Sequence, residues 1–101
     1  MQQVYNNVIY DTDTGILLAR KASRTLVKAG GLMEEMDESI ELYRTPNNAY
    51  FKYVVPKGPK GRTVGKITPL KPDEAMAEYN KLPTRILEPK EAFPDIELKE
   101  A

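Results

Sequence analysis

The 101-residue sequence contains no cysteine, no histidine and no tryptophan. Without cysteine the chain has no disulfide, no thiolate metal ligand and no cysteine nucleophile. Without histidine it lacks the most common general base, and with it the Ser-His and Cys-His catalytic arrangements. Several widespread types of catalytic and metal site are therefore excluded by composition alone.

Long apolar runs are also missing from the sequence. No stretch approaches the length of a membrane span, and the N-terminal residues lack the basic and then apolar pattern of a signal peptide. We therefore expect no membrane partner and a cytoplasmic protein. The hydrophobic fraction of 41% is enough for one small domain with one core.

The fifteen basic and fifteen acidic residues cancel, but they are segregated along the chain. Segregated charge presents faces of opposite sign to a partner. We predict an acidic partner-binding face formed by Glu34, Glu35, Asp37, Glu38 and Glu41. We also predict a basic loop and adjoining strand that bind a protein or a nucleic acid, made of Lys57, Lys60, Arg62, Lys66, Tyr50 and Lys52. Strand alternation would place Phe51 and Tyr53 in the core and Tyr50 with Lys52 outside.

Local patterns predict several strands and one helix. Asn6-Asn7 suits a hairpin turn between residues 2–5 and 8–10, and residues 46–48 suit a turn between strands in residues 40–55. Further strands are expected over residues 16–20 and 63–68. Residues 72–82 form the best helix, with Pro72 near its start and acids in its first turn.

Residues 22–39 lack a clear period, and Gly30-Gly31 would stop any helical turn that begins near Ser23. We interpret them as an irregular or weakly helical insertion. The predicted fold class is α+β: a small antiparallel sheet of five to six strands with a C-terminal helix packed on one face. Residues 1–82 would form this single domain, and residues 83–101 an extended or loosely packed tail.

The segment Asp11-Thr-Asp-Thr-Gly15 resembles the nucleophile motif of the haloacid dehalogenase phosphatases, but that motif has Gly before Thr. Hairpin-type turns also leave little room for the parallel sheet such enzymes need. An EF-hand loop would require a Glu where Ala22 stands. We therefore predict a turn, with Gly15 as a left-handed residue, and no catalytic residue, metal or cofactor. The acidic block offers hard oxygens, but we interpret it as a solvated face.

Three segments together carry a resemblance: residues 5–14, with Tyr-Asp-Thr-Asp-Thr, residues 41–51, with Leu-Tyr-Arg-Thr and Tyr-Phe, and residues 67–75, with Ile-Thr-Pro-Leu and Glu-Ala. The chain resembles small, mostly uncharacterised proteins of bacterial plasmids, conjugative elements and phages. It departs from them in residues 54–62, where they have a glycine-rich stretch, and at Tyr79, where Trp is common. The resemblance implies a mobile-element accessory protein that binds a host protein. We expect a non-enzymatic inhibitor of a host defence nuclease such as a CRISPR effector; the alternative is a nucleic-acid-binding regulator or antitoxin.

Overall fold

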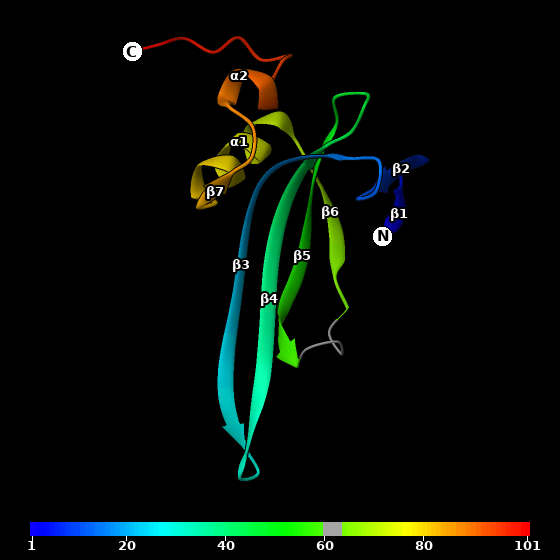
Figure 1. Cartoon of the computed structure of the whole chain (residues 1–101). Helices are drawn as coiled ribbons and strands as arrows, with labels where there is room; N and C mark the ends of the chain where they lie inside the picture. Colours follow the sequence, from blue (N-terminus) through cyan, green and yellow to red (C-terminus); the bar gives the residue numbers. More distant parts are fainter. Residues whose placement is uncertain (60–63) are drawn as a thin grey trace.

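The computed structural model describes residues 1–59 and 64–101. Its elements, in chain order and as labelled in Figure 1, are β1 (Gln2–Tyr5), β2 (Val8–Asp11), β3 (Ile16–Ala29), β4 (Leu32–Arg44), β5 (Tyr50–Pro59), β6 (Lys66–Leu70), α1 (Pro72–Lys81), β7 (Thr84–Arg85) and α2 (Pro89–Ala92).

The main sheet has five strands in the order β6-β5-β4-β3-β7, and β1 and β2 form a separate two-stranded hairpin. Every pairing in both sheets is antiparallel. The predicted α+β class with an antiparallel sheet is therefore confirmed. Hairpins account for this order, because β3, β4, β5 and β6 are consecutive in the chain and adjacent in space.

Asparagines with positive φ make the two predicted turns. Asn6 and Asn7 have φ values of 49° and 65°, which suit the two-residue turn between β1 and β2. Asn48, with φ of 62°, lies in the turn between β4 and β5. Asparagine tolerates this left-handed conformation better than most residues, so both hairpins follow from local chemistry.

The prediction for residues 22–39 is wrong. These residues belong to two long strands, β3 and β4, which pair without interruption from Ala19 and Leu42 to Ala29 and Leu32. Gly30 and Gly31, with φ values of 58° and 80°, form the hairpin turn instead of ending a helix. The segment has no clear apolar period because, as described below, its strands run beyond the core.

One face of the sheet carries the helices, and we call it the helical face. Leu18, Leu42 and Tyr50 from the sheet are buried there in one cluster with Ala75 and Tyr79 of α1. Tyr50 was predicted to lie outside, and this prediction is wrong: its side chain is 3% exposed. The alternation of β5 is as expected, but both of its faces are covered here.

The opposite face carries the β1–β2 hairpin, and we call it the hairpin face. Tyr43, Phe51 and Ile67 form its buried cluster, with Tyr5 and Tyr10 packed against them. The Phe51 ring lies 5.0 Å from that of Tyr43 and 5.7 Å from that of Tyr10, measured between centroids. The N-terminal hairpin therefore packs on the second face of the sheet. Figure 1 shows it on the β6 side of the molecule, away from the helices.

The segment after Pro83 was predicted to be an extended or loosely packed tail, whereas the structure packs much of it on the sheet. Thr84 and Arg85 of β7 pair with β3, and the Ile86 N–H donates to the Leu18 carbonyl oxygen at 2.9 Å. Phe93, after α2, is 1% exposed and lies 5.3 Å from the rings of Tyr50 and Tyr79. Its burial holds the segment against the helical face, so the core extends beyond the predicted boundary at residue 82.

Candidate functional site

The Asp11–Gly15 segment forms a hydrogen-bonded turn. Asp11 accepts the N–H of Asp13 on its side chain and the N–H of Gly15 on its carbonyl, each at 2.9 Å, while its second carboxylate oxygen accepts from Gln2 at 3.2 Å. Gly15 is not left-handed, contrary to expectation. Glycine fits closely here, because a Cβ would lie 3.0 Å from Tyr43 and from the Asp11 carbonyl oxygen, and one of these groups would have to move by a few tenths of an ångström. Within residues 1–59 and 64–101, no three acidic side chains are grouped to hold a metal ion.

A protruding hairpin is the most distinctive surface of the molecule. We call residues 21–38 the arm: the distal parts of β3 and β4 with the Gly30-Gly31 turn. Figure 1 shows β3 and β4 running together past the ends of β5 and β6, far from the helices and from the β1–β2 hairpin. The molecule is accordingly elongated, with principal extents of 54 × 37 × 18 Å. None of the arm's described side chains is buried.

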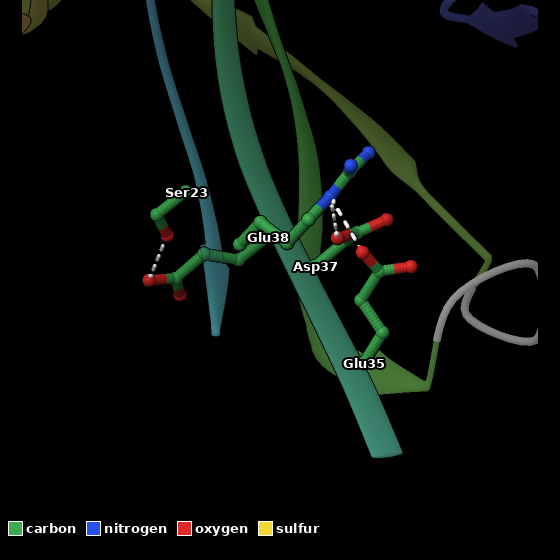
Figure 2. A network of polar contacts seen from close by, with 5 residues as sticks. Ser23, Glu35, Asp37 and Glu38 are labelled. Atoms are coloured by element: carbon green, nitrogen blue, oxygen red, sulfur yellow. Dashed lines mark hydrogen bonds and ion pairs between the residues drawn. The ribbon is translucent and has the colours of Figure 1, made fainter. Parts of the chain in front are cut away.

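Polar contacts across the two strands stabilise the arm (Figure 2). On the helical face, the Ser23 hydroxyl donates to Glu38 at 2.9 Å. On the hairpin face, the Arg24 Nε lies 3.2 Å from both Asp37 and Glu35. Such cross-strand pairs contribute modestly to hairpin stability in the absence of a core. The arm is therefore built from strand pairing, its glycine turn and surface polar contacts.

The predicted acidic face is divided between the two sides of β4. Successive strand residues point to opposite faces, so Glu34 and Glu38 lie on the helical face, and Glu35, Asp37 and Glu41 lie on the hairpin face. Figure 2 shows Glu38 directed away from Asp37 and Glu35. Treating the block as one face is correct only for an irregular or helical segment, and these residues form a strand.

The described residues of the predicted basic loop and strand differ in exposure. Tyr50 is buried, and the Lys52 ammonium lies 3.4 Å from the Glu78 carboxylate of α1. Lys57 and Lys66 are exposed near the ends of β5 and β6. Lys60 and Arg62 lie outside the described residues.

Four apolar side chains near the tip of the arm are exposed, and no contact surface was predicted there: Leu26, Val27, Leu32 and Met33. Leu32 and Met33 are 76% and 62% exposed. The signal that could have identified the arm is Gly30-Gly31 between two runs that contain β-branched or apolar residues, a hairpin pattern. Apolar residues gathered at a protruding tip are typical of a contact surface.

Comparisons with protein-family models, with curated proteins and with solved structures found no match. Across the described ranges, no helix combines the length and the apolar character that crossing a membrane requires. The candidate site is therefore assigned from its own geometry. It is the arm, a two-stranded hairpin with an apolar tip that extends from the covered part of the sheet.

Proposed function

We propose that this chain is a non-enzymatic binding protein that inhibits a host defence nuclease, such as a CRISPR effector, through its arm. One observation carries the proposal: β3 and β4 continue beyond the core as a bare hairpin with exposed apolar residues at its tip. Inhibition would be steric, because a hairpin inserted into a nuclease groove occludes the groove without chemistry. The resemblance to mobile-element proteins favours a host defence target.

The chemistry of the arm supports a protein partner. Leu32 and Met33 at the tip would supply apolar burial, while the charged strands beside them would supply orientation. The apolar residues would dominate affinity, since a few well-buried side chains usually carry most of the binding energy.

The alternative, a nucleic-acid-binding regulator, has less support. Tyr50 cannot stack on a base while it is buried in the core, and Lys52 is engaged by Glu78. Salt-sensitive DNA or RNA affinity would revive this alternative.

The test is a panel of purified defence nucleases, each mixed with the tagged chain and assayed for complex formation and nuclease inhibition. We expect one nuclease to bind and to be inhibited, and cells expressing the chain to accept a plasmid that this nuclease targets. A double variant with Leu32→Asp and Met33→Asp should bind at least about a hundredfold more weakly, because two hot-spot contacts are lost.

A matched control is available on the β1–β2 hairpin. Val4 and Ile9 are also exposed, at 64% and 59%, and a double variant with Val4→Asp and Ile9→Asp makes the same chemical change away from the arm. It should retain binding and inhibition. Equal losses in the two double variants would contradict a role for the arm, and no complex and no protection with any nuclease would overturn the proposed function.

A further inference from the structure

The two edges of the main sheet differ in how their backbone groups are paired. On the β6 edge, the Ile67 N–H donates to the Gln3 side chain at 2.6 Å, and the Tyr5 hydroxyl donates to the Ile67 carbonyl at 2.7 Å. On the opposite edge, β7 pairs with Ala19 and Arg20 of β3. Beyond Arg20, no strand in the described part of the chain pairs with this side of β3.

The uncovered edge presents backbone groups at known positions. Ala29 and Leu32 flank the two-residue Gly30-Gly31 turn and form the hydrogen-bonded pair that closes it, so the Ala29 N–H and C=O point toward β4. In a regular antiparallel strand every second residue points its N–H and C=O to the same side. Ala22, Arg24, Leu26 and Lys28 therefore point theirs away from β4, as Arg20 does toward β7. Such a row is a template for another strand.

We propose that this edge, residues 21–28, binds an extended acidic segment of a partner protein by strand addition. The segment would continue the main sheet beside β3, beyond the position of β7. The inference rests on the proposed function only for the identity of the partner, and it adds the chemistry by which that partner is recognised.

The charge of β3 selects an acidic segment. No acidic residue occurs between Asp13 and Glu34, whereas Arg20, Arg24 and Lys28 recur at every fourth position and share the hairpin face. Carboxylates opposite these residues in an added antiparallel strand would form cross-strand charge pairs. Asp37 and Glu35 of β4 lie 3.2 Å from the Arg24 Nε, so a carboxylate placed opposite Arg24 would share or replace these exposed partners, which hold Arg24 only weakly.

The same charges disfavour a second copy of this chain as the occupant. When two copies of β3 pair antiparallel about Arg24, that residue faces its own copy and Arg20 faces Lys28. Like charges in opposing positions destabilise a strand pair, and cationic side chains on edges commonly prevent self-association. The free chain should therefore not dimerise through this edge.

The test uses three synthetic peptides and the amide resonances of the intact protein. The acidic probe, Glu-Val-Val-Thr-Glu-Thr-Val-Glu, would place its first and fifth residues opposite Lys28 and Arg24 when antiparallel. A second peptide carries Lys in place of each Glu. A third keeps each Glu but has Pro at the third and seventh positions, which removes two N–H donors without changing charge.

We expect the acidic probe to shift the amide signals of Ala22, Arg24, Leu26 and Lys28 and to slow their hydrogen exchange. The lysine peptide and the proline peptide should each bind at least about tenfold more weakly, since each loses charge pairs or backbone hydrogen bonds. Equal binding of the proline peptide would overturn strand addition, and equal binding of the lysine peptide would overturn selection for acids. If the free protein self-associates through these amides, the edge binds a second copy of this chain and the proposal of an acidic partner segment is overturned.

Two protein variants complete the test. Ala22→Pro removes an outward N–H but no bond to β4, so it should fold and bind the acidic probe at least about tenfold more weakly. Lys28→Glu is a second variant that does not depend on the folding of Ala22→Pro, because Lys28 is exposed. It should also weaken binding of the acidic probe. If both variants bind a nuclease as tightly as the wild type does, nuclease binding does not use this edge, and the proposed function remains intact. A probe that binds while no nuclease does would support the edge site and count against the proposed function.

Discussion

The same two strands have opposite surroundings at their two ends. Near the helices, Leu42 of β4 is fully buried; four residues earlier on the same face, Glu38 lies on the arm and meets the Ser23 hydroxyl at the surface. We call the covered part of the sheet, with its two buried clusters, the base. The base is held by side-chain packing on both faces, whereas the arm is held by pairing between its strands.

Because of this difference, we expect the base to determine the stability of the fold and the arm to make the contacts with a partner. A two-stranded hairpin is marginal alone, and here the arm is anchored by strands that continue into the base and by β5, which pairs with β4 as far as Met36. Changes on the arm should therefore affect binding far more than folding, and changes in the base the reverse.

The largest expected effect is the removal of a core ring from the base. Phe51 is fully buried between the rings of Tyr43 and Tyr10. Phe51→Ala should lower the free energy of unfolding by about 3–5 kcal/mol, because burial is lost and a cavity remains. Chemical denaturation followed by circular dichroism measures this change.

The arm supplies the contrast for that measurement. Leu26 is 65% exposed, so Leu26→Ala should change the free energy of unfolding by no more than about 0.5 kcal/mol. If Leu26→Ala destabilised the protein as much as Phe51→Ala, the arm would be part of the core and the comparison would fail.

An intermediate effect is expected at alkaline pH, and it comes from the base. Burial raises the pKa of Tyr43, and the Glu41 carboxylate, which accepts its hydrogen bond at 3.1 Å, raises the pKa further. Burial also raises the pKa values of Tyr50 and Tyr79. In the unfolded chain these hydroxyls ionise near pH 10. Their stabilisation is therefore complete below about pH 10 and is lost as the pH rises toward their folded-state pKa values.

The Tyr43→Phe variant isolates this dependence. Each buried tyrosine contributes a slope of up to about 1.4 kcal/mol per pH unit above pH 10, so the variant should lose stability less steeply than the wild type. The arm contains no tyrosine, so the difference between the two slopes reports on the base alone. Identical slopes from pH 9 to 12 would show that Tyr43 ionises as freely in the folded protein as in the unfolded chain.

The contrast between base and arm also explains what the sequence could predict. The asparagine turns and α1 were predictable because their signals are local: residues that tolerate positive φ, and Pro72 with acids in the first turn. The Glu74 side chain indeed accepts the Lys71 N–H at the start of α1, at 2.8 Å.

The wrong prediction for Tyr50 concerns a position whose surroundings depend on residues distant in the sequence. Tyr50 has the pattern of an outward strand residue, and its side is buried by residues that come much later in the chain, those of α1 and Phe93. The strands of the arm were not predicted for the opposite reason. The arm has no buried face, so β3 does not need to alternate apolar and polar residues, and this alternation is the main sequence signal of a strand. The contact surface could not be predicted before the arm itself was recognised.

The smallest effect distinguishes two ion pairs, one in each region. In the base, Lys52 and Glu78 join β5 to α1 at 3.4 Å, with side chains 29% and 19% exposed; on the arm, Arg24 and Asp37 are 3.2 Å apart but 60% and 34% exposed. Double-mutant cycles with alanine should give a coupling of about 0.5–1 kcal/mol for the first pair and about 0.2–0.5 kcal/mol for the second, which water screens more.

Added salt should reduce the coupling on the arm more than the coupling in the base, because exposed pairs are screened more strongly. A larger and salt-resistant coupling for Arg24 and Asp37 would mean that the arm excludes water around its charges. The arm would then be a rigid, preorganised surface, and its cations would be less available to an acidic partner. A weak coupling leaves Arg24 free to exchange its carboxylate partners on binding, which strand addition by an acidic segment requires.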